Sequence, residues 1–407
     1  METLIRPIVK ALVVGLGAVG SVIAQVLLEG RAIESVTMAD KNIAQALKIA
    51  KLSHSKTKVV KIDANNNEEL NAVIEGKDVV INASHPRFNH QMMDLSLANG
   101  ANYIDLAGNG LNEQLAQDSA WREAGLLAVP GLGEDPGLSN IYARYVADRL
   151  DKVDEIKVRD GENSTSTKFE FMLLFSPEVF FSEVLDSPRT FINGKRVFSP
   201  PLSGKEMYEF PEPIGMQPVY LVDHEEVMTL PEYIGKGVRY VDFKLALTDQ
   251  CVSILNVLKK LGLMDTKLVE VKGSKVAPIE LLNSVIPTPV SVSKTVRGYT
   301  GIVVEVKGKK GGSAVTYKLG TMASHTESYR RLRENGTSFL TGVVPAMCVR
   351  MLAEGKIKQK GVIPPESLEP YPILRELSQE GVDTKISKTE LGKIRNEEAI
   401  APTPTAL

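Results

Sequence analysis

The run from Val13 to Gly20, Val-Val-Gly-Leu-Gly-Ala-Val-Gly, carries the clearest chemistry, because it joins an apolar segment to an amphipathic one. Gly15 permits a tight turn, Gly17 lets the backbone approach a pyrophosphate, and Gly20 allows close packing of helix on strand. N–H groups at the start of the following helix would face the phosphates. Asp40 ends the next apolar segment, where its carboxylate would bind ribose hydroxyls. This pattern predicts a dinucleotide site at Gly15, Gly17, Ala18, Val19, Gly20 and Asp40.

Asp40 also indicates which dinucleotide is preferred. A carboxylate here would repel the 2′-phosphate of NADP, so we expect NAD as the cofactor, with NADP less favourable. Lys41 follows directly and would weaken that repulsion.

The elements that must position these residues alternate along the first 150 residues. Six short apolar runs are each followed by a segment of helical period, at Ile8–Val14, Ser35–Ala39, Lys58–Ile62, Asp78–Asn82, Asn102–Leu106 and Leu126–Val129. This alternation predicts a doubly wound parallel sheet, an α/β Rossmann fold, with ligands bound beyond the carboxyl ends of the strands. The residues that follow the strands join the predicted cofactor site, namely Asp63, Ala83, Ser84, Gly108 and Gly131.

Composition excludes several functions. The chain has 407 residues, 43% of them hydrophobic, with a net charge of −2, and this balance argues against nucleic acid as a partner. Cys251 and Cys348 lack metal-ligand spacing, so neither a zinc site nor a disulfide framework is expected, and a reducing cytoplasm fits. We see no signal sequence and no apolar stretch of membrane-spanning length, so no membrane partner is expected.

A second domain is predicted after about residue 140, where β-branched and aromatic segments follow one another, several without an intervening helix. Expected strands include Val153–Arg159, Ser166–Phe175, Arg239–Leu247, Val290–Val292, Tyr299–Lys307 and Ala314–Leu319. We expect a Rossmann domain at 1–140, an α+β domain at 141–335, C-terminal helices at 336–395 and a disordered tail at 396–407.

Several motifs resemble the saccharopine dehydrogenase-like family. They are Val129-Pro130-Gly131-Leu132-Gly133-Glu134-Asp135-Pro136-Gly137, Phe175-Ser176-Pro177-Glu178, Val238-Arg239-Tyr240, Thr341-Gly342-Val343-Val344-Pro345 and Gly361-Val362-Ile363-Pro364-Pro365. Within that family the compact length and the motif Ile192-Asn193-Gly194-Lys195 look most like bacterial lysine 6-dehydrogenases, although Asp135 is closer to saccharopine reductases. The resemblance implies that the second domain binds substrate and helps to form a homodimer, and that the C-terminal segment returns to the Rossmann domain.

The resemblance also implies oxidation of an amine by a nicotinamide cofactor, with the side-chain amine of L-lysine as the expected substrate and a semialdehyde as the product. Two alternatives are a Schiff-base reductase of the saccharopine or carboxynorspermidine dehydrogenase type and a non-catalytic NAD-binding regulator. Fold alone does not decide among them.

Transfer of a hydride from a carbon that bears nitrogen needs a neutral amine and a group that stabilises the resulting iminium. The catalytic candidates are therefore two carboxylates, Asp135 and Asp105, and two histidines, His85 and His224. Asp135 and His85 are expected to flank the nicotinamide. Each candidate has a structural alternative, since Asp105 and Asp135 could cap helices and His224 could lie on a surface loop.

A substrate carboxylate needs a cation, and Arg offers a bidentate fork that Lys cannot. Arg239, within the family motif, and Arg297, beside Gly298, are the candidates from the second domain. Ser176 and Glu178 of the Phe175–Glu178 motif complete the predicted substrate site.

Overall fold

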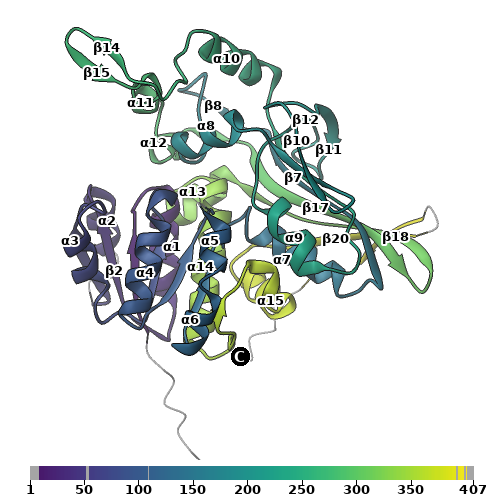
Figure 1. Ribbon diagram of the computed structural model, residues 1–407, viewed down its shortest axis with the longest axis horizontal. Coiled ribbons are helices and arrows are strands. Elements are labelled where there is room, and N and C mark those ends of the chain that lie inside the picture. Colours follow the sequence, from purple (N-terminus) through teal and green to yellow (C-terminus); the bar gives the residue numbers. More distant parts are fainter. Residues whose placement is uncertain (1–8, 52–54, 109, 391–392, 398–399, 401–407) are drawn as a thin grey trace, which may run out of the picture.

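The chain forms two domains, each built around its own sheet (Figure 1). The computed structural model describes residues 9–51, 55–108, 110–390, 393–397 and 400. A seven-stranded sheet occupies the Rossmann domain, and a ten-stranded sheet lies across its upper edge in the view of Figure 1.

The Rossmann sheet has the strand order β19-β6-β5-β4-β1-β2-β3, and neighbouring strands all pair in parallel. The six predicted apolar runs form its first six strands in sequence. Their bounds are β1 (Val9–Val14), β2 (Ile33–Asp40), β3 (Thr57–Lys61), β4 (Val79–Asn82), β5 (Asn102–Asp105) and β6 (Leu127–Val129). The connecting helices are α1 (Ala18–Glu29), α2 (Ala44–Ala50), α3 (Asn67–Ile74), α4 (Asn89–Ala98), α5 (Leu111–Leu115) and α6 (Asp118–Glu123).

The second sheet is mixed. Strands β13 and β7 pair in parallel at its centre, and the other pairs are antiparallel. Its strands are β7 (Lys152–Glu162), β9 (Arg189–Ile192), β10 (Lys195–Phe198), β11 (Glu206–Glu209), β12 (Met216–Leu221), β13 (Tyr240–Ala246), β17 (Tyr299–Lys310), β18 (Ser313–Ser324), β20 (Lys385–Glu390) and β21 (Lys393–Glu397). The accompanying helices are α7 (Leu138–Ala147), α8 (Pro177–Leu185), α9 (Glu226–Ile234), α10 (Asp249–Lys260), α11 (Pro278–Val285), α12 (Pro289–Ser293) and α13 (His325–Leu332). Two short strand pairs, β8 (Thr165–Ser166) with β16 (Val296–Arg297) and β14 (Val269–Val271) with β15 (Ser274–Val276), lie outside this sheet.

The C-terminal segment returns to the Rossmann domain, as the resemblance implied. Helix α14 (Gly336–Ala353) packs against α1, and β19 (Gly361–Val362) adds a seventh parallel strand beside β6. Helix α14 has the length and apolar composition of a membrane span, yet 83% of it is buried in the protein, which is the burial of a core helix. The fold class is therefore confirmed: a Rossmann domain with an inserted α+β domain.

Two of the strands predicted outside the Rossmann domain are wrong. Val290–Val292 lies in helix α12, because Thr288 accepts the N–H of Ser291 as an N-cap and Pro289 starts the first turn. Only the first residue of the predicted strand Ser166–Phe175 is in a strand, β8.

The predicted C-terminal segment also ends differently. After α15 (Pro370–Gln379), residues 385–390 leave the Rossmann domain and pair with β18 of the second sheet. Residues 396 and 397 of the predicted disordered tail belong to β21, whereas 401–407 lie outside the described residues. Strand β20 has the sequence Lys-Ile-Ser-Lys-Thr-Glu, in which Ile386 is the one apolar residue, so its sequence gave little apolar signal for a strand.

The contact between α1 and α14 makes a stability prediction. A Cβ on Gly342 would lie 2.7 Å from Val22 Cγ1 and 3.0 Å from the carbonyl oxygen of Val19. Gly342→Ala should lower the free energy of unfolding by about 1–3 kcal/mol, because overpacking outweighs the gain of about 1 kcal/mol in helix propensity. Urea denaturation measures the change. Gly17→Ala is the control, because its Cβ would meet open space; a Gly342→Ala protein as stable as the parent would contradict the packing argument.

Candidate active site

The turn after β1 has the form of a phosphate cradle. Gly15 has a φ of +93°, and a Cβ there would lie 2.6 Å from the backbone of Ala83. A Cβ on Gly20 would lie 1.8 Å from the carbonyl oxygen of Gly15, whereas one on Gly17 would meet open space. Helix α1 begins at Ala18, and such a helix start favours an anion. The glycines therefore close the turn where they are needed and leave room where a pyrophosphate would approach.

Three charged side chains lie beyond the ends of β2 and β3. The Asp40 carboxylate accepts the N–H of Leu16 at 2.5 Å, which ties it to the glycine turn. Lys41 is exposed and forms an ion pair with Asp63 at 3.2 Å. Hydrogen bonds from Asn65 lower the pKa of Asp63 to about 2. Asp40, Lys41 and Asp63 stand where an adenosine would bind, and their contact with a cofactor stays a prediction.

A cavity lies between the two domains, and we call it the inner cavity. Val19, Ala83 and Ser84 line it from the Rossmann domain, and Asp160, Glu183 and His224 line it from the second domain. Asp135, from the loop between β6 and α7, lies between the two sets. Ser176 also lines this cavity, and its contact with a substrate stays a prediction. The glycine turn and four titratable groups thus meet at one space.

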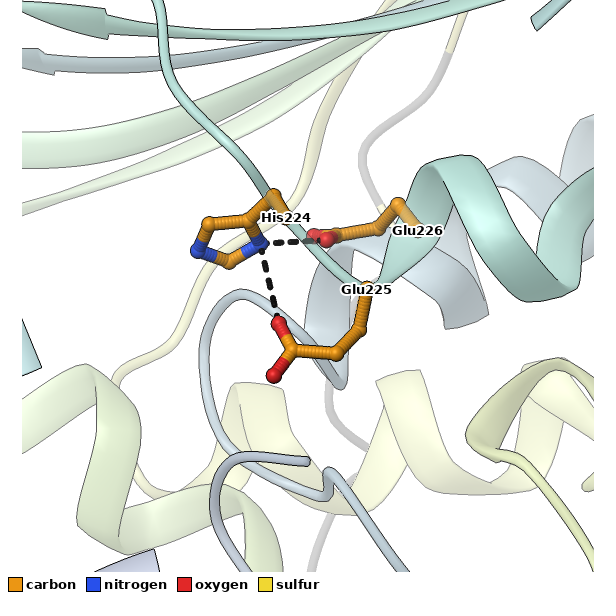
Figure 2. A group of neighbouring side chains, drawn as sticks. All are labelled: His224, Glu225 and Glu226. Carbon is orange, nitrogen blue, oxygen red and sulfur yellow. Dashed lines mark hydrogen bonds and ion pairs between the residues drawn. The ribbon is translucent and has the colours of Figure 1, made fainter. Parts of the chain in front are cut away.

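His224 is held firmly in the wall of this cavity. Its Nδ1 donates to Glu226 Oε2 at 2.5 Å (Figure 2). Glu226 Oε1 in turn accepts from Ser139 Oγ at 2.6 Å. The ring stacks on Phe243 with centroids 3.8 Å apart, and the residue is 5% exposed. Nε2 makes no hydrogen bond with a described residue; its only described partner is Glu183 Oε1 at 4.0 Å. His224 therefore has one nitrogen fixed and one open.

The charges around His224 determine its protonation. Burial alone would lower the pKa of His224, but the negative charges of Glu226, Glu225 and Glu183 raise it well above its ordinary value. The opposite shift occurs at Glu226, where His224 lowers the pKa despite burial. His224 is accordingly an imidazolium at neutral pH.

In contrast to Glu226, the carboxylates that line the inner cavity have raised pKa values. Burial raises the pKa of Asp160 to about 7 and that of Glu183 to about 8. Burial and the nearby Asp160 and Glu134 raise the pKa of Asp135 well above its ordinary value. The inner cavity thus holds more carboxylates than cations, and a positively charged ligand would relieve that imbalance.

A second space, the outer cavity, shares Pro86, Glu183 and His224 with the inner one. His85, Glu178 and Gly108 line it, and His85 Nε2 lies 3.2 Å from Glu178 Oε2. His85 Nδ1 accepts the N–H of Arg87, and burial lowers the pKa of His85. His85 is therefore less protonated than His224 at neutral pH, and it lines the outer cavity rather than the inner one.

Glu225 links the domains at this point. Its Oε1 accepts the N–H of Gly108 at 2.8 Å, so the loop after β5 is tied to the segment before α9. The ligand atoms of His224, Glu225 and Glu226 lie within 4.8 Å of one another, a spacing that could hold a metal ion. The Nδ1 of His224 is already engaged with Glu226, however, and we assign no metal there.

Asp105 and Gly131 have structural positions instead of the predicted site positions. Asp105 is 1% exposed, and its carboxylate accepts the N–H of Gly131 at 2.7 Å and the amide of Gln114 at 2.7 Å. Burial raises the pKa of Asp105 to about 7. Neither Asp105 nor Gly131 lines the inner or the outer cavity. Asp105 fixes the turn that presents Asp135.

The two arginines predicted to bind a carboxylate also lie elsewhere. The Arg239 side chain is 62% exposed and pairs with Asp154 at 3.1 Å. Arg297 is exposed and donates to the carbonyl oxygens of Lys294 and Val296. Neither Arg239 nor Arg297 lines the inner or the outer cavity, and a role for them in binding a substrate carboxylate stays a prediction.

Four residues of the site were not predicted from the sequence. They are Asp160 and Glu183 of the inner cavity, Arg189 of the outer cavity, and Glu226, which bonds His224. Glu226 was the easiest to find, since it follows His224 by two residues in an acidic run. Asp160 and Glu183 lie in ordinary strand and helix patterns, where a polar residue is typical of a solvent-exposed face.

Comparisons with known proteins agree with this architecture. The model of the saccharopine dehydrogenase NADP binding domain matches residues 11–129, and that of the saccharopine dehydrogenase C-terminal domain matches residues 133–382. Both models describe domains of saccharopine dehydrogenases, which places the chain among the nicotinamide-dependent oxidoreductases. The chain belongs to the saccharopine dehydrogenase family.

Among curated relatives, carboxyaminopropylagmatine dehydrogenase of Synechocystis sp. is 28% identical over 388 residues, covering 92% of this chain and 96% of the relative. Carboxynorspermidine synthase of Vibrio alginolyticus is 28% identical over 406 residues, covering 93% and 97%. Among solved structures, saccharopine dehydrogenase (L-Glu forming) of Saccharomyces cerevisiae has a TM-score of 0.70 at 15% identity, covering 94% of this chain and 100% of that one. Homospermidine synthase of Legionella pneumophila, in complex with NAD, has a TM-score of 0.68 at 15% identity, covering 95% and 93%.

The pairing of His224 with Glu226 makes a prediction about protonation. Glu226→Gln removes the nearest negative charge, so the acid dissociation constant of His224 should rise by about tenfold or more. NMR titration of the imidazole protons measures it. Glu225→Gln, at 3.6 Å from Nδ1 instead of 2.5 Å, is the control and should have a smaller effect. Equal titration of His224 in parent and Glu226→Gln would contradict the assignment.

Proposed function

We propose that this enzyme uses a reduced nicotinamide cofactor to reduce the imine that forms between a primary amine and a carboxylate-bearing aldehyde, which yields a secondary amine. The observation that carries the proposal is the inner cavity, where Asp135, Asp160 and Glu183 surround the open nitrogen of a protonated His224. The names of the curated relatives support it, since carboxyaminopropylagmatine and carboxynorspermidine are amines with a carboxylate-bearing substituent. These relatives favour Schiff-base reduction over the oxidation of lysine.

The residues of the inner cavity have complementary roles. His224 Nε2 would donate its proton to the imine nitrogen, and the carboxylates of Asp135 and Asp160 would stabilise the iminium cation that results. Ala83 and Ser84 line the cavity where a nicotinamide would be held, and that cofactor would supply hydride chemistry when bound. After transfer, the nitrogen is a secondary amine and His224 is neutral until it regains a proton.

The apolar wall of the inner cavity holds the His224 ring in place and keeps water out. Phe243 stacks on the His224 ring and, with Phe175 and Leu245, lines the cavity. Such a wall excludes water that would hydrolyse the imine, and it strengthens the attraction between the carboxylates and the cation. Glu226 acts through His224, because it keeps the ring protonated and aims Nε2 at the cavity.

An assay of both directions tests the proposed function. Loss of NADH or NADPH absorbance should require both an amine, such as agmatine or putrescine, and an aldehyde, such as succinate semialdehyde or aspartate semialdehyde. His224→Asn should lower kcat by about 10²–10⁴-fold and leave the Kd of the nicotinamide cofactor unchanged. His90→Asn is the matched control, because His90 lies on α4 and lines neither cavity, and it should retain most of the activity. The proposal fails if lysine with oxidised cofactor is turned over faster than every aldehyde and amine pair.

NAD is the cofactor that Asp40 favours over NADP. Its carboxylate lies 2.5 Å from the N–H of Leu16, at the turn where a ribose would bind, and would repel a 2′-phosphate. Asp40→Ser should narrow the ratio of kcat/KM for NADH over NADPH by about tenfold to a hundredfold. Asp94→Asn is the control, because Asp94 is an exposed aspartate on α4, away from the ends of β2 and β3. A parent enzyme that prefers NADPH would overturn this assignment.

A further inference from the structure

The outer cavity contains a cation that the mechanism does not use. Arg189 is the one arginine, and there is no lysine, among the described residues that line the inner and outer cavities. We propose that Arg189 binds the carboxylate of the aldehyde component and thereby selects carboxylate-bearing aldehydes. This inference rests on the proposed function, because it assigns one half of the same substrate.

Arg189 is oriented as a carboxylate receptor would need to be. Its Nε and Nη2 donate to the two carboxylate oxygens of Asp223, at 2.7 and 2.5 Å. A guanidinium has five N–H donors, so this pair uses two and leaves three. No acceptor among the described residues bonds Nη1. The side chain is 21% exposed, so it is accessible from the outer cavity yet shielded enough to make a strong contact.

The ion pair between Arg189 and Asp223 is not needed to anchor strand β9. Asp223 Oδ1 also accepts the backbone N–H of Arg189 at 3.0 Å, a contact that any residue at this position would make. The guanidinium is therefore not needed to hold β9 in place. Because Asp223 already holds the planar guanidinium, its remaining N–H groups can bind a ligand with little further loss of side-chain entropy.

The charges in the outer cavity fit a carboxylate at Arg189 and a cation elsewhere. Glu178 and Asp186 line the same space, and burial together with Asp223 raises the pKa of Asp186. A carboxylate alone is attracted only by Arg189, whereas an amino-acid head has an ammonium group for the acids as well. Because the outer cavity shares Glu183 and His224 with the inner one, a short chain from Arg189 would lead to the reacting carbon.

The test compares aldehydes that differ in the carboxylate. Succinate semialdehyde and butanal are each paired with putrescine and the reduced cofactor, and kcat/KM is measured for parent and Arg189→Gln. The variant should lose about tenfold to a hundredfold with succinate semialdehyde, mostly through KM, and less than about twofold with butanal. Arg189→Lys keeps the charge without the fork and should lose less than Arg189→Gln. Methylguanidine should partly restore Arg189→Gln with succinate semialdehyde only.

Controls separate the possible failures. Arg239→Gln removes an exposed arginine that also pairs with an aspartate, and it should leave both rates unchanged. Equal losses with both aldehydes, or no loss with either, would overturn the role of Arg189 while the proposed function stands. If Arg189→Gln does not fold, Arg189→Lys gives the same comparison. The proposed function itself fails when no aldehyde and amine pair oxidises the cofactor with the parent enzyme.

Discussion

The excess of buried carboxylate around one imidazolium is the constraint on which the site depends. Asp135, Asp160 and Glu183 meet at a space where the only described cation is His224, and His224 is already paired with Glu226. Charges of one sign this close raise their own pKa values, and burial raises them further. Values of about 7 and 8 for Asp160 and Glu183 mean that these groups exchange protons near neutrality. A bound cation would lower those pKa values and release protons, so binding and protonation are linked.

That arrangement needs the chain to leave the Rossmann domain and come back. Asp160 comes from β7 and Glu183 from α8, whereas Asp135 and Ala83 follow Rossmann strands. Two hydrogen bonds hold the residues of the second domain against those of the Rossmann domain. The Glu225 carboxylate accepts the N–H of Gly108, and Ser139 at the start of α7 donates to Glu226. The chain returns to the Rossmann domain, where β19 pairs with β6 at one edge of the sheet and α14 packs against α1. Thr337 and Thr341 of α14 line the inner cavity. A site between domains therefore rests on a discontinuous fold.

The Rossmann half was predictable because its signals are local. Each buried strand is a short apolar run, and the glycine spacing reflects clashes within one turn. The second domain is different: Arg159 and Asp160 are neighbours on β7 and point to opposite faces, where Arg159 pairs with the buried Asp242 and Asp160 lines the cavity. The alternation of side chains along a strand does not show which face of the sheet another domain will cover. Arg239 had a family motif and proved exposed, whereas Arg189 had no local signal, because its role depends on Asp223, which is distant in sequence.

The same electrostatics also bears on the direction of the reaction. An acidic cavity stabilises an iminium, but it stabilises an ammonium as well and so raises the pKa of a bound amine. An ammonium has no lone pair to assist departure of a hydride, so the amine must lose its proton before it is oxidised. The negative charges of the cavity oppose that deprotonation. Reduction has no such penalty, because the imine must gain the proton that His224 holds. For the proposed reaction, near-neutral pH therefore favours reduction of the carbon–nitrogen double bond, and oxidation of the amine becomes competitive only as the pH rises through the raised pKa of His224.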